Sequence, residues 1–352
     1  MKPWLVLIII IILIIAVILF GIIVFIPCLI RKTGFGRYDD NHTLHYFTHH
    51  DFEGMTQKKF SFSSNNLTLQ GYLYQMDGVE RKGIIVFAHG LGAGHIQYTT
   101  EIHHFAQLGY LVYTFDAQGC LNSEGKGLKY ITNYPKNLDD FLTYLEENEL
   151  DGETYSLVGH SLGAYGVNLM SQFHHDIDRI VSMSGFDSIE KFMGDMLSSA
   201  KSMGKLIAKI LCHQEKRKNK KYYLSSSEVL ANRKPEILLI SGNLDSIVKP
   251  VKHFEYYKQI LKEDENAHFM LVEGRAHRPL LTIEASDYDT KRNMDLLELR
   301  KRYKNKVPSH ELKQYYENLD YHLLVELDDQ IMRHIDRFLD HQEIEKDITI
   351  KM

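Results

Sequence analysis

The most constraining feature of this sequence is a short glycine-flanked segment, Gly159–Gly163, which reads Gly-His-Ser-Leu-Gly. It follows an apolar run at residues 155–158 that predicts a strand, and it precedes a helical pattern at residues 162–173. A sharp turn from strand to helix has room only for small flanking residues, so the two glycines let Ser161 project. The segment therefore predicts that Ser161 is a nucleophile. The alternative is a glycine-rich connection with an incidental serine.

The residues that would activate such a serine are found downstream. A serine hydroxyl is a weak nucleophile near neutral pH and needs a histidine base, which a carboxylate orients. Asp245 and His277 each follow an apolar run that predicts a strand. Because loops at the carboxyl ends of parallel strands meet at one edge of a sheet, we expect both side chains to lie near Ser161. Glu273 is a rival for the acid, and His310 is a distant rival for the base.

A tetrahedral intermediate also needs hydrogen-bond donors for its oxyanion. One expected donor is the backbone N–H of Leu162, directly after the serine. The second is the N–H of Leu91, in the Gly-rich segment 89–92 that follows a predicted strand. That segment is alternatively a simple tight turn. It is not a phosphate cradle, because it lacks a Gly-Lys-Ser/Thr sequence and no G-x-G-x-x-G opens a helix there.

The rest of the chain alternates short apolar runs with helical patterns, which predicts the α/β class: a mostly parallel sheet flanked by helices. The expected strands are an opening hairpin at 59–63 and 67–76, and then 83–88, 111–115, 155–158, 179–183, 236–240 and 268–272. The expected helices are 99–108, 138–147, 162–173, 250–261 and 323–339.

The N-terminus carries an uncharged, strongly apolar run at residues 5–30. A bilayer core of about 30 Å requires roughly 20 apolar residues in a helix, so this run predicts a transmembrane anchor in a single-pass membrane protein. A cleaved signal peptide is the alternative, but its apolar region is about 7–15 residues long and ends at small residues. The lipid bilayer is therefore an expected partner.

The side of the membrane on which the soluble part lies stays undecided. Lys2 precedes the span and three basic residues follow it within residues 31–37, which weakly favours a cytoplasmic domain. Two N-x-S/T triplets, Asn41–Thr43 and Asn66–Thr68, would instead suit an external or lumenal domain, although such triplets often arise by chance.

The organisation expected after the anchor is a linker at 31–57 followed by one large domain at 58–342. Two stretches interrupt the alternation. Residues 186–233 contain apolar positions at three- and four-residue steps, which predicts an inserted amphipathic helix. Residues 282–318 are charged and contain tyrosines, and we expect a helical insertion of unknown role there.

Composition excludes several function classes. A 44% hydrophobic and 25% charged chain of 352 residues is typical of globular proteins, and the net charge of -5 argues against a nucleic-acid partner. The three cysteines provide neither a disulfide framework nor a CxxC metal spacing. No metal and no organic cofactor is implied.

From Leu67 to His277 the chain resembles the α/β-hydrolase superfamily. Within it, the chain looks like the branch of monoacylglycerol-lipase-like and lysophospholipase-like enzymes that includes the serine aminopeptidase-type domain. The matching pieces are His89-Gly90, Asp116–Gly119 with Ser123 and Gly125, Gly159–Gly163, Asp245 and His277. The family pattern D-x-R-G-x-G-x-S-x-G is only partly kept, since Gln118 replaces its arginine and Leu121 replaces a glycine.

The resemblance implies an α/β-hydrolase fold in which residues 186–233 form a lid over an acyl-binding cavity. Four apolar lid residues are then expected to line the acyl entrance: Met193, Met196, Met203 and Ile207. It also implies hydrolysis of carboxylic esters, with acylglycerols or lysophospholipids as substrates. The alternatives are a peptidase of the same fold and a catalytically silent, membrane-tethered binding protein.

Overall fold

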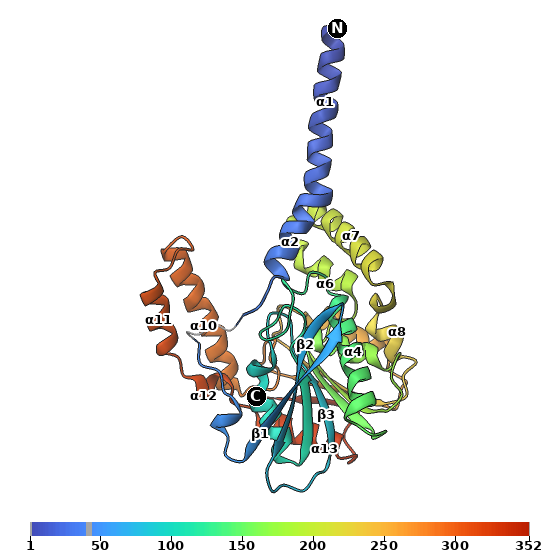
Figure 1. The fold of residues 1–352 in the computed structure, drawn as a ribbon, viewed down its shortest axis with the longest axis vertical. Coiled ribbons are helices and arrows are strands. Elements are labelled where there is room, and N and C mark those ends of the chain that lie inside the picture. The colour runs from blue at the N-terminus through green and yellow to red at the C-terminus, as the bar shows by residue number, and fades with distance from the viewer. Residues whose placement is uncertain (1, 40–43, 352) are drawn as a thin grey trace.

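A computed structural model describes residues 2–39 and 44–351 of the protein (Figure 1). Within these residues the chain builds a nine-stranded sheet of order β1-β2-β4-β3-β5-β6-β7-β8-β9. β1 and β2 form an antiparallel hairpin, β2 pairs antiparallel with β4, and all other neighbours are parallel. The strands are β1 Met55–Ser64, β2 Leu67–Met76, β3 Gly83–Ala88, β4 Tyr110–Phe115, β5 Tyr155–His160, β6 Ile177–Met183, β7 Glu236–Gly242, β8 Ala267–Val272 and β9 Asp347–Ile350.

The mostly parallel sheet flanked by helices that the sequence predicts is confirmed. One face packs on α4 (Asn133–Asn148), α5 (Leu162–Met170) and α9 (Phe254–Ile260). The other face packs on α3 (Thr99–Gln107) and α13 (Asp329–Leu339). The central strands β3 and β5 are buried almost throughout, because helices cover both faces of the sheet.

Several boundaries differ from those expected. β9 pairs with β8 and therefore extends the sheet beyond residue 342, where the sequence placed the end of the domain. With only four residues, β9 gives too short a pattern to be recognised without its partner. The single helix expected at 323–339 is divided, because Asp328 caps the start of α13 and separates it from α12 (Tyr321–Leu324).

The N-terminus forms one continuous helical rod, built from α1 (Pro3–Phe20), the π-helical segment η1 (Gly21–Phe25) and α2 (Ile26–Gly34). Its most apolar window has a mean hydropathy of 3.8, and none of that window is buried. Figure 1 shows α1 standing clear of the domain. The rod is long and apolar enough to cross a membrane, although a signal sequence meets the same criterion.

The expected linker at 31–57 is partly docked on the domain. Phe35 is buried, and the guanidinium of Arg37 donates to the carbonyl oxygens of Leu121, Ser123 and Gly125. The loop that receives Arg37 is therefore tied to the base of the N-terminal rod. Of the two N-x-S/T triplets, Asn41–Thr43 lies outside the described residues.

The expected lid region contains three α-helices instead of one: α6 (Ile189–Met196), α7 (Lys201–Lys218) and α8 (Ser226–Leu230). The chain turns back between α6 and α7, and Lys201 there has a φ of 49°. Gly204 permits this turn, because a Cβ at that position would lie 2.0 Å from the Leu197 carbonyl oxygen. A helical period alone does not reveal such a reversal, because the apolar residues of both helices face the same core.

The insertion at 282–318 forms a helical hairpin of α10 (Ile283–Arg302) and α11 (Ser309–Glu317). In Figure 1 this hairpin projects from the side of the domain, and its connecting loop points the same way as α1. Its base is held near the sheet, where Leu281 and Leu327 form an isolated antiparallel bridge.

Candidate active site

Ser161 occupies a strained turn between β5 and α5. Its φ of 57° and ψ of -114° lie in a region that non-glycine residues rarely adopt. The turn is possible because both flanking residues are glycines: a Cβ at Gly159 would lie 2.6 Å from the Gly163 carbonyl oxygen, and one at Gly163 would lie 2.0 Å from the Ala88 carbonyl oxygen. The geometry is that of a nucleophile elbow, which presents the serine hydroxyl above the start of a helix.

The structure brings Ser161, His277 and Asp245 together. Ser161 Oγ lies 2.9 Å from His277 Nε2, and His277 Nδ1 lies 2.8 Å from Asp245 Oδ2. Asp245 is on the loop after β7 and His277 is on the loop after β8, so neighbouring strands deliver both groups to the same sheet edge. Of the rivals, His310 lies on α11 with its side chain 80% exposed, and neither it nor Glu273 takes part in these contacts.

Hydrogen bonding keeps Asp245 ionised and oriented. Burial alone would raise the pKa of this carboxyl. Hydrogen bonds from His277 and from the N–H groups of Val248 and Ile247 lower it by more, so the net pKa lies below its usual range. A carboxylate can only accept, so His277 Nδ1 carries the proton of this pair. Nε2 is then free to accept the hydroxyl proton of Ser161.

The segment expected to supply an oxyanion donor lies directly beside the serine. A Cβ at Gly90 would be 3.4 Å from Ser161 Cβ, which places this glycine against Ser161. His89 shapes the segment: its Nδ1 donates to the Gly90 carbonyl at 2.8 Å, and its Nε2 accepts from the N–H of Ala117 at 3.1 Å. The N–H groups of Leu91 and Leu162 have no acceptor among the described residues.

A buried chain of hydrogen bonds joins these parts, and the sequence analysis did not identify it. The N–H of Gly90 donates to Tyr98 Oη at 3.1 Å, Tyr98 donates to His160 Nδ1 at 2.8 Å, and His160 Nε2 donates to the His277 carbonyl at 2.7 Å. Burial, and after it the neighbouring imidazole of His277, lowers the pKa of His160 to about 3. His160 is therefore neutral, as this arrangement of donors and acceptors requires.

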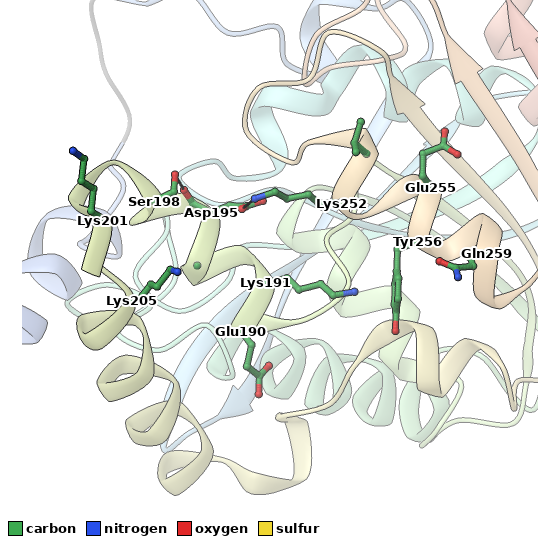
Figure 2. A pocket seen from close by; sticks show the side chains of 12 residues that line it. Glu190, Lys191, Asp195, Ser198, Lys201, Lys205, Lys252, Glu255, Tyr256 and Gln259 are labelled. Atoms are coloured by element: carbon green, nitrogen blue, oxygen red, sulfur yellow. Dashed lines mark hydrogen bonds and ion pairs between the residues drawn. The ribbon is translucent and has the colours of Figure 1, made fainter. Parts of the chain in front are cut away.

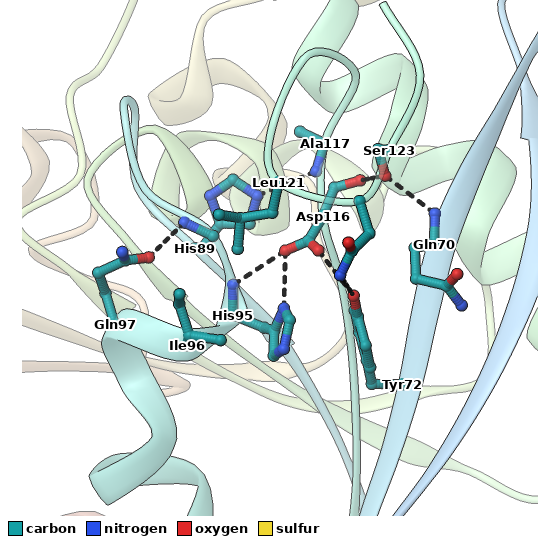
Figure 3. A network of polar contacts seen from close by, with 12 residues as sticks. Gln70, Tyr72, His89, His95, Ile96, Gln97, Asp116, Ala117, Leu121 and Ser123 are labelled. Atoms are coloured by element: carbon teal, nitrogen blue, oxygen red, sulfur yellow. Dashed lines mark hydrogen bonds and ion pairs between the residues drawn. The ribbon is translucent and has the colours of Figure 1, made fainter. Parts of the chain in front are cut away.

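A second network holds the loop after β4, which carries the partly kept family pattern (Figure 3). Asp116 accepts from Nδ1 of His95 at 2.8 Å and from Tyr72 Oη at 2.9 Å. Burial raises the pKa of Asp116, but the neighbouring His95 more than offsets this, and the net pKa is lowered. The Ser123 hydroxyl donates to the Asp116 carbonyl oxygen at 2.6 Å, which closes the loop on itself.

The two departures from the family pattern are accommodated in this loop. Gln118 is buried and donates to the carbonyl oxygens of Gly127 and Leu128, while its own oxygen accepts from Asn65. Leu121 adopts a φ of 41°, which a glycine would adopt more easily. The amide of Gln118 thus cross-links the loop at the position where the family pattern of the resemblance has an arginine.

The four expected entrance residues of the lid are not gathered in one place. Met193 and Ile207 are buried in the main core cluster, whereas Met196 is 41% exposed and Met203 is 47% exposed. A pocket of about 650 Å³ lies beside the lid between α6 and the segment 251–259 (Figure 2). Most of the residues that line it are polar or charged, such as Lys191 and Asp195. The side chains of Ser161, Asp245 and His277 do not line it.

Comparisons with known proteins agree with this fold. Residues 79–235 match the family model described as serine aminopeptidase, S33. The esterase Pf2001 of Pyrococcus furiosus is 18% identical with a TM-score of 0.52, covering 74% of this chain and 94% of that one. The acylaminoacyl peptidase of Pyrococcus horikoshii is 19% identical with a TM-score of 0.51, covering 65% of this chain but only 38% of that longer one.

No curated protein sequence matches the chain. Among the described residues, no group of three or more His, Cys, Asp or Glu side chains is placed to hold a metal ion. The chain therefore has the fold of these esterase and peptidase structures, and its residues 79–235 resemble the serine aminopeptidase-type hydrolases described by that family model.

Proposed function

We propose that this protein is a membrane-anchored serine hydrolase that cleaves carboxylic esters of the acylglycerol or lysophospholipid type. The observation that carries the proposal is the continuous relay from Ser161 through His277 to Asp245, with contacts of 2.9 and 2.8 Å. Both distances lie within hydrogen-bond reach, which a nucleophile and its base require.

The mechanism follows from these positions. His277 Nε2 removes the proton from Ser161 as Oγ attacks the acyl carbonyl, and Asp245 stabilises the imidazolium that forms. The N–H groups of Leu91 and Leu162 stabilise the oxyanion. His277 then protonates the leaving alkoxide, and an acyl-enzyme remains on Ser161. A water molecule, deprotonated by His277, releases the fatty acid and restores the serine.

The ester class is supported by the lid and the N-terminal rod. A single-chain acyl ester partitions into a bilayer, and an anchored enzyme meets it there without searching the aqueous phase. Met196 and Met203 present exposed apolar surface on the lid, above Met193 and Ile207 in the packed layer. We propose that the exposed pair borders the acyl entrance while the buried pair fixes the position of the lid.

A peptidase is the second candidate, because the family model that matches residues 79–235 is described as a serine aminopeptidase. The two candidates are separated by assaying the purified full chain in detergent on acyl esters of increasing chain length and on aminoacyl amides. The proposal predicts that kcat/KM is higher for the esters and rises with chain length. A higher kcat/KM for the amides would contradict the ester assignment.

The anchor is a separate proposal, and it rests on the 32-residue rod at Pro3–Gly34. We expect the full chain to stay in the membrane pellet after alkaline carbonate extraction, whereas a truncated protein beginning at Thr33 is released. A mature chain whose N-terminus lies beyond residue 30 would identify the rod as a cleaved signal sequence instead.

A further inference from the structure

The connection between α10 and α11 concentrates positive charge at the end of the hairpin. Residues 299–306 contain five basic residues and no acidic one, whereas residues 283–298 contain five acidic and two basic residues. The hairpin is therefore polarised along its length. We refer to the five basic residues as the hairpin tip: Arg300, Lys301, Arg302, Lys304 and Lys306.

The hairpin tip is not neutralised by the protein itself. All five side chains are exposed, and none forms an ion pair with any residue in the described ranges. Charges lower on the hairpin do form pairs, since Arg292 lies 2.6 Å from Asp289 and Lys313 lies 3.5 Å from Glu317. Of the basic residues lower on α10, only Lys291 has no ion pair with a described residue, so the unpaired positive charge is concentrated at the end of the projection, which faces away from the domain.

The direction of the hairpin tip relative to the N-terminal rod follows from the way in which the rod and the hairpin are attached to the domain. The N-terminal rod is fixed because Arg31 donates to Gln214 on α7 at 2.5 Å and because Phe35 is buried. In Figure 1 the loop between α10 and α11 points the same way as α1 and reaches the level of α2. If α1 crosses a bilayer, the hairpin tip consequently lies on the side of the domain that faces the headgroups.

The base of the hairpin is anchored close to the candidate active site. Ser286, in the first turn of α10, accepts from the N–H of Ala276, the residue before His277. Tyr288 accepts from the N–H of Asp320 at 2.9 Å, which ties α10 to the segment that leads into α12. Hydrogen bonds at its base therefore fix the hairpin to the domain.

We propose that the hairpin tip binds the anionic headgroups of the bilayer that α1 enters, and so holds the domain at a second point. The inference rests on the proposed anchor. Residues 299–306 carry no large hydrophobic side chain that is highly exposed, so the attraction is electrostatic and salt-dependent. A soluble polyanion would satisfy the same charges, but it gives no reason for the tip and the rod to point the same way.

The test uses the full chain reconstituted in vesicles. A donor dye is placed at the tip through Ser309→Cys, with Cys28→Ala to remove the exposed thiol, since Cys120 and Cys212 are buried. Energy transfer to an acceptor on lipid headgroups is compared between phosphatidylcholine and phosphatidylcholine with phosphatidylserine. We expect greater transfer with phosphatidylserine. Raising the salt from about 0.1 M to about 1 M shortens the Debye length from about 10 Å to about 3 Å and should abolish the difference.

Two variants make the result specific. Changing all five residues of the hairpin tip to glutamine should remove the effect of phosphatidylserine. A control, Lys291→Gln with Lys313→Gln, removes exposed charges lower on the hairpin and should retain it. Equal energy transfer in both lipids by the inserted wild-type chain would overturn the inference. If that chain is also retained on heparin, and the five-residue variant is not, the partner is a soluble polyanion instead.

The outcomes also separate this inference from the proposed function. A chain that fails to insert contradicts the anchor and this inference together. An inserted chain that hydrolyses a short soluble ester but shows no lipid-dependent transfer contradicts this inference alone. The five-residue variant should hydrolyse that soluble ester at the wild-type rate, because none of the five residues belongs to the relay.

Discussion

The elbow edge of the sheet, formed by the loops after β3, β5, β7 and β8, contrasts with the helical attachments, which are the lid region and the α10–α11 hairpin. At the elbow edge, buried polar groups such as those of His160 and Asp245 have partners inside the fold. The attachments leave charged and apolar groups exposed, such as Arg300 and Met203. Interior contacts therefore fix Ser161, His277 and Asp245, whereas the attachments leave exposed the surface that we propose for contact with substrate and membrane.

This difference predicts that substitutions at the two regions have different effects. A change at the elbow edge leaves buried polar groups without hydrogen-bond partners or forces the tightly packed backbone to shift. Such a change should therefore impair turnover or stability. An equivalent change on an attachment should be nearly silent in solution. Pairs of matched substitutions, one in each region, test this contrast.

The largest effect is expected for the relay itself. His277→Ala removes the base, and Asp245→Asn removes the charge that orients it, so each should lower kcat on a soluble ester by about 10³–10⁴-fold. Circular dichroism should show an unchanged fold. The matched change on the hairpin is His310→Ala, which should leave kcat unaltered. Comparable losses from His277→Ala and His310→Ala would show that the base has been misassigned.

The elbow glycine gives the next largest effect, measured as the free energy of unfolding in urea. Gly163→Ala places a Cβ 2.0 Å from the Ala88 carbonyl oxygen. The backbone must then shift, at a cost of about 1–3 kcal/mol or more. Gly194→Ala on the lid meets nothing within 4 Å and should stabilise α6 by up to about 1 kcal/mol. If both changes lowered the free energy of unfolding equally, the elbow edge and the lid region would not differ in their tolerance of an added Cβ.

A smaller effect is expected for the buried chain through Tyr98. Tyr98→Phe leaves the N–H of Gly90 and Nδ1 of His160 without partners, at a cost of about 1–3 kcal/mol. Because these groups position the oxyanion loop and His277, kcat should fall by about 10-fold or more while KM stays nearly constant.

Tyr315→Phe is the control on the hairpin, where the hydroxyl donates to the Arg292 carbonyl at 2.6 Å. It also removes one hydroxyl contact, which is partly buried, but it should leave kcat unchanged. A rise in KM without a fall in kcat for Tyr98→Phe would indicate that Tyr98 contributes to binding and does not position the relay.

The smallest effect is expected for the pH dependence of stability, which His174 should influence where the core contacts the lid region. Burial lowers the pKa of His174, but hydrogen bonds to Asp139 and Glu146 outweigh it and raise the pKa to about 9. The same Asp139 also forms an ion pair with Lys221, which lies between α7 and α8 of the lid region. The raised pKa stabilises the fold fully below pH 6.5, and this stabilisation is lost as the pH rises through 9.

We therefore expect the melting temperature to fall by a few degrees between these two pH values, and His174→Gln to flatten that dependence. An unaltered pH dependence in the variant would show that other groups cause it. Lys291→Gln on the hairpin serves as the control, because an exposed charge should have little effect on the pH dependence.

The sequence predicted the parts of the molecule that local patterns determine. The glycines around Ser161 and the apolar runs of the central strands each carry their own signal, so the elbow and the positions of Asp245 and His277 were predictable. The link from Tyr98 through His160 to His277 was not, because its members lie 62 and 117 residues apart and meet only in the folded state. No local pattern specifies such partners.

The attachments were harder to predict for a different reason. The amphipathic pattern in 186–233 is the same whether one helix or two pack on the core, and the close approach of Gly204 to Leu197 decides between them. Likewise, the charge of residues 299–306 was visible in the sequence, but its meaning depends on the direction of the hairpin relative to α1. The roles that we propose for these segments therefore depend on their three-dimensional arrangement, which composition does not reveal.

The central claim is that Ser161 is the nucleophile of a working relay. The most direct measurement is labelling of the full chain with a fluorophosphonate probe, followed by mass analysis of its peptides. We predict stoichiometric modification at Ser161, and loss of both labelling and turnover in Ser161→Ala. Stoichiometric labelling that persists in Ser161→Ala would place the nucleophile elsewhere, and a folded wild-type chain that is never labelled would support the silent binding protein instead.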